Sequence, residues 1–308
     1  MLGVSSLQLK QLLKEAKTRP KQTIAIANAF DQEVLQAIIA ASEMELAHFL
    51  LFGDETKICP LLQELDDKQV TSSFVTYYHY ENTEDAVQQA ILACKNQQAT
   101  ILMKGKVSTS TLIKEVLKES YDLKTNRIFS QVAIFELPNY PKPVLLTDGG
   151  INIAPTLEKK VQIIYNAVKV AHALKIKRPK VALLAAIEHV NPAMPATIDA
   201  ASITMMNQRN QITDCIIDGP LAFDVAISME AKHLKRLESE VAGDADILVA
   251  PYIEVANALY KTFTYIAKAP MASILVGAKI PIVLTSRADT ADCRLHSIAL
   301  AIVTANQI

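Results

Sequence analysis

A hydroxyl and a guanidinium group follow the last buried strand that the sequence predicts. The apolar, β-branched run 282–284 leads into Thr-Ser-Arg at residues 285–287, and residues 289–305 repeat apolar positions at helical spacing. In open α/β sheets ligands bind at the carboxyl ends of strands, and the rigid fork of an arginine binds two phosphate oxygens at once. Ser286 and Arg287 therefore indicate an anion site beside a helix start. The structural alternative is that Ser286 and Asp289 cap the helix and that Arg287 is a solvated surface residue.

A second candidate anion site lies in segment 104–110. This segment reads Lys-Gly-Lys-Val-Ser-Thr-Ser, and it connects a predicted strand, 100–103, to a predicted helix that ends near Glu119. Lysines, a glycine and hydroxyls at such a junction can bind an anion, and Ser108 can also cap the helix. The segment is not a nucleotide-binding P-loop, because GxxxxGK[ST] is missing. The alternative is that Ser108 is simply a cap and that the lysines are solvated.

The composition excludes several classes of protein. The chain has 308 residues, 50% of them hydrophobic, a net charge of −1 and no tryptophan. It has neither a long basic run nor many aromatic residues for nucleic-acid binding, and no apolar run approaches the roughly 18 residues that span a bilayer. Residues 1–14 lack the apolar core of a signal peptide. These features predict a cytoplasmic protein that binds neither nucleic acid nor a membrane.

The four cysteines indicate no disulfide framework and no zinc site. They are Cys59, Cys94, Cys215 and Cys293, and none forms a CxxC pair. We expect most of them to be small buried hydrophobic residues. Cys293 lies close to the first candidate site, but a catalytic thiol requires a histidine partner, which the sequence does not indicate.

Short apolar runs alternate with helical patterns of about 10–15 residues, which is typical of a parallel α/β sheet. The predicted strands cover residues 23–27, 48–52, 74–78, 100–103, 132–137, 144–147, 181–187, 212–217, 247–250 and 282–284. The predicted helices cover 5–17, 55–65, 83–95, 157–174, 197–207, 254–267 and 289–305, and another starts at residue 31. Run 273–276 is either a strand or the end of a helical region. Residues 218–221, Asp-Gly-Pro-Leu, are predicted to form a turn that opens a helix.

A proline-rich turn divides this pattern. It joins the runs 132–137 and 144–147, and its prolines bar a regular helix. The second run leads into Asp148-Gly149-Gly150, whose glycines permit unusual backbone geometry. Residues 148–155 are therefore the predicted crossing between two domains.

Six blocks of the sequence resemble the phosphate acetyl/butyryl transferase family, most closely the phosphate butyryltransferases, including branched-chain phosphotransacylases. The blocks occur in order and cover residues 103–110, 147–155, 190–197, 217–222, 243–249 and 276–289. The resemblance implies two α/β domains with a cleft between them, like the fold of isocitrate and isopropylmalate dehydrogenases. It assigns residues 1–140, completed by 270–308, to the first domain and residues 141–269 to the second.

The resemblance also implies a reaction. Acyl-CoA and inorganic phosphate would give acyl phosphate and CoA, reversibly, with a butyryl or branched-chain acyl group and with no bound cofactor or metal. Ser286 would donate a hydrogen bond to the tetrahedral oxyanion, and Arg287 would hold the phosphate. The implied partners are acyl-CoA, inorganic phosphate and acyl phosphate, and the family's usual homodimer is expected.

The catalytic base is left open by the resemblance. Acetyl-specific members of the family place an aspartate a few residues after the serine, and ungapped counting from Ser286 reaches Cys293 in this chain. Asp292 is adjacent and is the preferred base, with Asp289 as the second choice. The structural alternatives are that Asp289 caps the helix and that Asp292 interacts with the helix dipole from the first turn.

Six further residues are expected to bind substrate by resemblance: Lys104, Gly105, Ser108, Thr109, Asn257 and Lys261. For Lys261 the alternative is an exposed helix face. Where relatives read Pro-Asp-Ile-Glu-Ala-Gly-Asn, this chain reads Pro-Tyr-Ile-Glu-Val-Ala-Asn at residues 251–257, so an acidic residue and a glycine are lost. Tyr252 is expected either to reshape the acyl or CoA pocket or to weaken the activity.

Three alternative functions are weighed. A phosphate acetyltransferase would use the same chemistry on a shorter acyl chain. A pocket distinguishes acyl chains that differ by one methylene by only about 1–3 kcal/mol. An NAD-linked dehydrogenase of the same fold is disfavoured, since the chain has no GxGxxG loop and no carboxylate cluster for a divalent metal. A non-catalytic relative that binds CoA or acyl phosphate is the third, because of the acidic residue lost at Tyr252.

Overall fold

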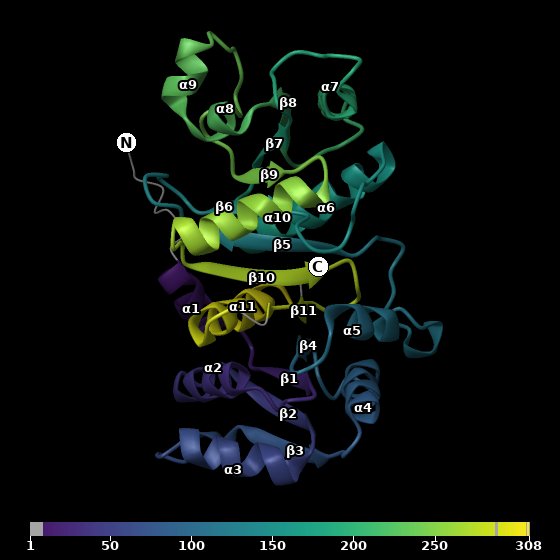
Figure 1. Cartoon of the computed structure of the whole chain (residues 1–308), viewed down its shortest axis with the longest axis vertical. Coiled ribbons are helices and arrows are strands. Elements are labelled where there is room, and N and C mark those ends of the chain that lie inside the picture. The colour runs from purple at the N-terminus through teal and green to yellow at the C-terminus, as the bar shows by residue number, and fades with distance from the viewer. Residues whose placement is uncertain (1–8, 287–288, 306, 308) are drawn as a thin grey trace. The chain divides into compact units, whose positions relative to one another are not determined.

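The computed structural model describes residues 9–286, 289–305 and 307, and the chain forms two compact units (Figure 1). The N-terminal unit contains Leu9–Arg127 and the described residues in the range 272–305. The middle unit contains Ile128–Met271. Each unit has its own strands and helices.

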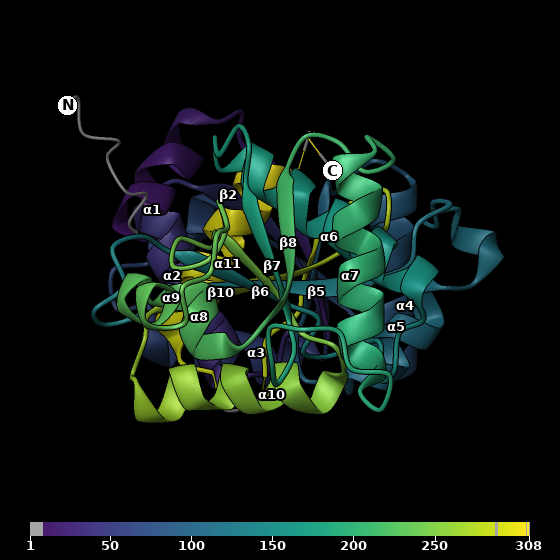
Figure 2. The same ribbon diagram turned by 90° about the horizontal axis from the view of Figure 1, so that it is seen from above.

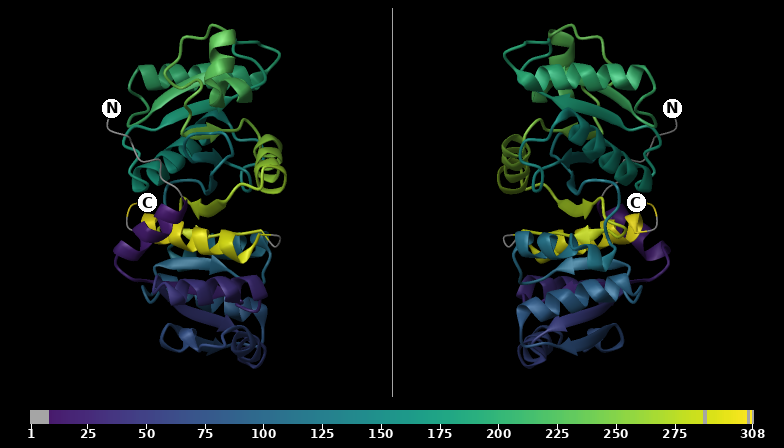
Figure 3. Two further views of the ribbon diagram at one scale, coloured as in Figure 1. Left: turned by 90° about the vertical axis from the view of Figure 1, so that its left-hand side faces the viewer. Right: turned by 90° about the vertical axis from the view of Figure 1, so that its right-hand side faces the viewer.

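The strands of the N-terminal unit run in the order β3-β2-β1-β4-β11-β10. They are β1 (Gln22–Ala27), β2 (Ala47–Gly53), β3 (Val75–His79), β4 (Ile101–Lys104), β10 (Met271–Val276) and β11 (Ile282–Val283). Neighbouring strands are parallel except β10, which is antiparallel to β11. The helices are α1 (Leu9–Thr18), α2 (Gln32–Glu43), α3 (Glu55–Leu65), α4 (Thr83–Lys95), α5 (Thr109–Val116) and α11 (Ala291–Thr304), with short 3₁₀ turns at Val70–Ser73 and Glu119–Tyr121. Helix α11 packs between α1 and α2, as Figure 3 shows.

The middle unit has the strand order β5-β6-β9-β7-β8. Its strands are β5 (Ser130–Phe135), β6 (Val144–Thr147), β7 (Lys180–Leu184), β8 (Ile216–Leu221) and β9 (Ile247–Val249). Strand β5 is antiparallel to β6, and the other pairs are parallel. The helices are α6 (Leu157–Ala173), α7 (Pro195–Gln208), α8 (Phe223–Ile227), α9 (Met229–Leu234) and α10 (Ile253–Lys261), and Thr262–Ile266 extend α10 as a π-helix. Helix α7 packs along β8 (Figure 2).

The predicted α/β class is confirmed, and its causes are visible in the burial pattern. Strands β4, β6 and β10 are buried along their whole length, which is why they read as continuous apolar runs rather than alternating ones. Helix starts carry the expected caps: the side chain of Asp31 accepts from the Val34 N–H, and that of Asn82 from the Glu84 N–H. Run 273–276, which the sequence left ambiguous, is a strand.

The turn predicted at residues 218–221 is wrong. These residues are the end of β8, and the following helix begins only at Phe223. A Cβ atom on Gly219 would lie 2.6 Å from the Cβ of Leu183 and 2.9 Å from its carbonyl oxygen. The Gly-Pro pair therefore serves a close approach of β7 and β8 rather than a chain reversal. Among the described residues, no helix is both long and apolar enough to span a bilayer.

Candidate active site

Three parallel strands end at the same edge of the N-terminal unit. Ala27 of β1 is in register with Lys104 of β4, and Met103 of β4 is in register with Val283 of β11. Because the strands are parallel, the chain leaves each of them at their common carboxyl edge (Figure 1). The structure thus brings together, at this edge, the two segments that the sequence singled out, 104–110 and 284–286.

Lys104 is the last residue of β4, and it is 4% exposed. Its Nζ donates to the carbonyl oxygen of Gly105 at 3.2 Å and to that of Val107 at 3.4 Å. The ammonium group is therefore held against the loop that starts α5. This buried placement excludes the alternative of a solvated surface lysine for Lys104, whereas Lys106 is exposed with its Nζ 4.6 Å from the ring centre of Phe30.

Gly105 lies where two backbones nearly touch. A Cβ atom at this position would lie 2.0 Å from the carbonyl oxygen of Asn28 and 2.8 Å from that of Ala27. The Gly105 N–H donates to the Ala27 carbonyl at 3.0 Å, and the next N–H, of Lys106, donates to the Asn28 carbonyl at 2.7 Å. Glycine at this position therefore allows the β4 loop to pack against the end of β1.

Ser108 caps α5, so the structural role weighed for it from the sequence is present. Its Oγ accepts from the Thr111 N–H at 3.0 Å and lies 2.7 Å from the Thr111 hydroxyl and 3.0 Å from that of Ser110. Thr109 is the first residue of α5 and is half-buried. The result is a cluster of hydroxyl groups at a helix N-terminus, next to the buried ammonium group.

Residues 286 and 289, which follow β11, are hydrogen-bonded to each other. The Ser286 N–H donates to Oδ2 of Asp289 at 2.7 Å, and the Asp289 N–H donates back to the Ser286 carbonyl at 3.1 Å. The proposed cap role of Asp289 is wrong, because the N-cap of α11 is Thr290, whose Oγ1 accepts from the Cys293 N–H. Arg287, the predicted phosphate ligand, lies outside the described residues.

Arg294 is a buried charged residue of this region that was not predicted from the sequence. It is 1% exposed, although it lies near the start of α11. Its guanidinium contacts Asp31 and the carbonyl oxygens of Asp289 and Ser286. A signal was available: Arg294 shares the buried stripe of α11 with Ile298 and Ala301, at successive spacings of four and three residues.

Asp292 is exposed in the first turn of α11, whereas Asp289 is 4% exposed and accepts the Ser286 hydrogen bond. Cys293 follows Asp292, at the position that ungapped counting gave for the base. Burial raises the pKa of the Cys293 thiol above its ordinary value of 9.0, and the nearby carboxylates of Asp289 and Asp292 act in the same direction, against hydrogen bonds from Thr290. The thiol is therefore protonated at neutral pH and is a poor base or nucleophile.

This protonation state gives a testable pH dependence. Alkylation requires the thiolate, so the rate at which iodoacetamide modifies Cys293 should still be rising above pH 9.0. Mass spectrometry of the modified peptide measures this rate, with free cysteine as the reference. Turnover of Cys293→Ser should match the wild type. If the alkylation rate of Cys293 levels off at or below the pH at which that of free cysteine does, or if Cys293→Ser loses turnover, the assignment of a protonated, non-catalytic thiol is contradicted.

The two remaining predicted residues lie on α10, in the middle unit. Asn257 donates from Nδ2 to the Gly149 carbonyl at 3.1 Å, so it fixes the loop after β6. Lys261 is exposed, and its Nζ lies 5.6 Å from the ring centre of Tyr265. Its exposure is what the alternative of a solvated helix face predicts, and its role toward substrate stays a prediction.

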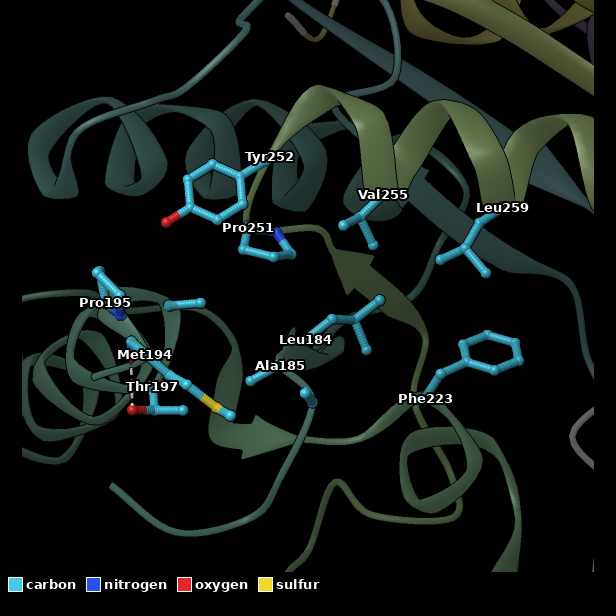
Figure 4. A pocket seen from close by; sticks show the side chains of 12 residues that line it. Leu184, Ala185, Met194, Pro195, Thr197, Phe223, Pro251, Tyr252, Val255 and Leu259 are labelled. Carbon is cyan, nitrogen blue, oxygen red and sulfur yellow. Dashed lines mark hydrogen bonds between the residues drawn. The ribbon is translucent and has the colours of Figure 1, made fainter. Parts of the chain in front are cut away.

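The middle unit contains an apolar pocket of about 480 Å³ (Figure 4). It lies beyond the carboxyl ends of β7, β8 and β9, and Leu184, Phe223, Tyr252 and Val255 are among its lining residues. On another side of Tyr252, the Nζ of Lys160 lies 5.3 Å from the ring centre. Tyr252 and Val255 are two of the positions at which a departure from the family pattern is expected from the sequence, and both line this pocket.

No group of three or more His, Cys, Asp or Glu side chains within residues 9–286 and 289–305 is arranged to hold a metal ion. The polar groups at the carboxyl edge of β1, β4 and β11 are an ammonium, hydroxyls, a carboxylate and a guanidinium. Such a set can bind an anion and can donate hydrogen bonds to a developing oxyanion.

Comparison with known proteins identifies the family. Residues 63–302 match the family described as phosphate acetyl/butaryl transferase. The chain is 44% identical over 301 residues to a probable phosphate butyryltransferase of Bacillus subtilis, covering 98% of this chain and 99% of that protein. It is 41% identical over 297 residues to a phosphate acetyltransferase of Thermotoga maritima, covering 96% and 99%.

The solved structures agree with the sequence relatives. A branched-chain phosphotransacylase from Enterococcus faecalis superposes with a TM-score of 0.81 at 36% identity, covering 93% of this chain and 100% of that one. The resemblance found in six blocks of sequence thus extends over nearly the whole chain. The protein belongs to the phosphate acetyl/butaryl transferase family.

Proposed function

We propose that this protein moves a butyryl or branched-chain acyl group between CoA and inorganic phosphate, interconverting acyl-CoA plus phosphate with acyl phosphate plus CoA. The observation that carries the proposal is the shared carboxyl edge of β4 and β11, where Lys104, Ser108 and Ser286 follow parallel strands in a chain related to phosphotransacylases. CoA and phosphate are substrates in this reaction, and it needs no bound cofactor.

Phosphate binding is assigned to the N-terminal unit. The start of α5 supplies N–H dipoles and the hydroxyl cluster around Ser108, and the Lys104 ammonium group is held beside it by carbonyl oxygens. Arg287 supplies the charge that persists at every working pH and the two-pronged contact to phosphate oxygens. These groups support a site for a small, multiply charged anion rather than for an uncharged ligand.

The chemistry is an acyl transfer through a tetrahedral intermediate. A phosphate oxygen attacks the thioester carbonyl carbon, the carbonyl oxygen becomes an oxyanion, and the C–S bond breaks as the carbonyl reforms. We propose that the Ser286 hydroxyl donates a hydrogen bond to this oxyanion. The backbone of Ser286 is hydrogen-bonded to Asp289. In the reverse direction the CoA thiol must lose its proton before sulfur attacks the acyl phosphate, which requires a base.

Asp292 is the better candidate for that base. The Asp289 carboxylate already accepts the Ser286 N–H, whereas Asp292 is exposed in the first turn of α11. We expect Asp292→Asn to lower kcat about 100-fold with only a small drop in melting temperature, because the lost carboxylate is the proton acceptor and its interaction with the helix dipole is worth about 0.3–1 kcal/mol. We expect Asp289→Ala to cost about 1.5–3 kcal/mol of stability, because a charge-assisted hydrogen bond is lost.

The matched control is Asp85→Asn, because Asp85 is also an exposed carboxylate in the first turn of a helix, α4. Steady-state kinetics in the CoA-acylating direction and thermal melts measure these three variants and also Asp289→Asn. Wild-type kcat in Asp292→Asn together with a loss of kcat, at unchanged melting temperature, in Asp289→Asn would transfer the role to Asp289.

Release of free thiol from butyryl-, isobutyryl- and acetyl-CoA, with and without phosphate, tests the proposed function. The proposal predicts release that requires phosphate and is fastest with four-carbon chains. Release mainly from acetyl-CoA would instead favour a phosphate acetyltransferase, the name carried by the Thermotoga maritima relative. No release from any acyl-CoA, with or without CoA binding, contradicts the enzyme assignment, and NAD-dependent turnover of a hydroxy acid would favour the dehydrogenase alternative.

The homodimer and the cytoplasmic location expected from the sequence belong to the same proposal. Apolar side chains exposed on α7, Ile198 and Met205, support contact with a second copy. Light scattering of the purified chain measures the assembly, and a monomer at micromolar concentration contradicts it.

A further inference from the structure

We infer that Arg294 is a positioning residue, which sets the place of Ser286 for the acyl transfer by linking Ser286 and Asp289 to the start of α2. This inference rests on the proposed function for the role of Ser286, and on the geometry of the N-terminal unit for the linkage itself. Arg294 contacts no reacting atom and acts through the backbone of Ser286 and Asp289.

The guanidinium group of Arg294 uses three of its nitrogens on three different partners. Nε donates to the Asp289 carbonyl oxygen at 3.3 Å, and Nη2 donates to the Ser286 carbonyl oxygen at 3.3 Å. Nη1 lies 3.4 Å from Oδ1 of Asp31, in an ion pair whose arginine side chain is 1% exposed. One buried side chain therefore contacts Ser286, Asp289 and the carboxylate of Asp31.

The position of the Asp31 side chain is itself fixed, because this side chain caps α2. The same Oδ1 accepts from the Val34 N–H at 3.1 Å and caps α2. Helix α2 follows β1, whose end packs against the Gly105 loop of β4. Within the N-terminal unit, Arg294 thus connects Ser286 and Asp289, which follow β11, with the start of α2.

Arg294 joins the hydrogen-bonded pair Ser286 and Asp289 to the rest of the unit through the carbonyl oxygens of both residues. A lysine at this position carries the charge on a single nitrogen, so it cannot reach the three acceptors that three separate nitrogens of Arg294 contact. Catalytic groups tolerate little displacement, and about 1 Å of misplacement can cost roughly 100-fold in rate.

The test compares Arg294→Lys with Arg19→Lys, a matched exchange at an arginine that pairs with Glu15 in the same unit. Per folded molecule, measured by circular dichroism, Arg294→Lys should lose about 10- to 100-fold in kcat/KM for phosphate, mostly in kcat. Arg19→Lys should keep wild-type constants. Hydrogen exchange of the peptide covering residues 284–291 should be faster in Arg294→Lys, and added guanidinium ion should partly restore turnover of Arg294→Ala.

A second variant, Asp31→Asn, tests the inference if Arg294→Lys does not fold. Asp31→Asn retains an oxygen acceptor for the Val34 N–H but removes the charge that pairs with Arg294, so it should move the same constants in the same direction by a smaller factor. Wild-type kcat and KM in the folded fraction of Arg294→Lys overturn the inference, as does a loss of stability alone.

The failure of the inference differs from the failure of the proposed function. If the wild type shows no phosphate-dependent turnover, the proposed function fails, and hydrogen exchange still decides the linkage. Unchanged exchange of residues 284–291 in both Arg294→Lys and Asp31→Asn overturns the positioning role whatever the wild type catalyses.

Discussion

Replacing Arg287 with alanine should lower phosphate-dependent release of thiol from butyryl-CoA by roughly 100- to 1000-fold. The reason is the charge of the nucleophile: phosphate carries its charge into the transition state, and a guanidinium group can bind two of its oxygens at once. The loss should appear in kcat and as a raised KM for phosphate, whereas the KM for butyryl-CoA should change little. Initial rates over a phosphate titration measure all three constants.

Two further variants control this experiment. Arg287→Lys keeps the charge but loses the two-pronged contact, so its rate should lie between those of wild type and Arg287→Ala. Arg209→Ala removes an exposed arginine at the end of α7 and should leave the rates unchanged. Phosphate-dependent rates of Arg287→Ala within a few-fold of wild type contradict the role assigned to Arg287 and favour the alternative of a solvated surface residue.

Gly105→Ala should cost about 3 kcal/mol in the free energy of unfolding, the upper part of the range for overpacked sites. The added Cβ would lie 2.0 Å from the backbone oxygen of Asn28, and neither neighbour is a flexible side chain that can move aside. Relief requires moving the β4 loop away from β1, which breaks the bonds from Gly105 and Lys106 to β1 and its following loop. Urea denaturation followed by circular dichroism measures the loss, and the displaced Lys104 should also raise the KM for phosphate.

Gly149→Ala is the matched control for this substitution. Its Cβ would meet Gln131 Oε1 at 3.6 Å and Ala256 at 3.7 Å, which is ordinary van der Waals contact. We expect its unfolding free energy to fall by less than about 1 kcal/mol. Equal denaturation midpoints for the two variants would contradict the close packing assigned to Gly105.

Local chemistry determines which parts of the structure could be predicted from the sequence. The cap at Ser108 depends on residues within three positions along the chain, so segment 104–110 indicates its strand-to-helix junction without tertiary information. The buried parallel strands are equally predictable, because a continuous apolar run between two helical patterns is typical of a strand that is covered on both faces.

The failures have a common physical cause, which is contact between residues far apart in the sequence. Asp218-Gly219-Pro220 has the composition of a turn, but packing of Gly219 on Leu183 keeps it in β8. Arg294 pairs with Asp31 across more than 260 positions of chain, and no pattern in either neighbourhood indicates the other. The sequence leaves Asp289 open as a cap or a base, because composition does not show that its carboxylate accepts the Ser286 N–H.

The central claim is that an acyl group passes from CoA to phosphate. Incubating the protein with butyryl-CoA and inorganic phosphate, and measuring free thiol and acyl phosphate in the same samples, tests it most directly; hydroxylamine traps the acyl phosphate as a hydroxamate. We expect one acyl phosphate for each thiol released and no product of either kind without phosphate. Thiol release without acyl phosphate would mean that water accepts the acyl group, and it would contradict the proposed transfer.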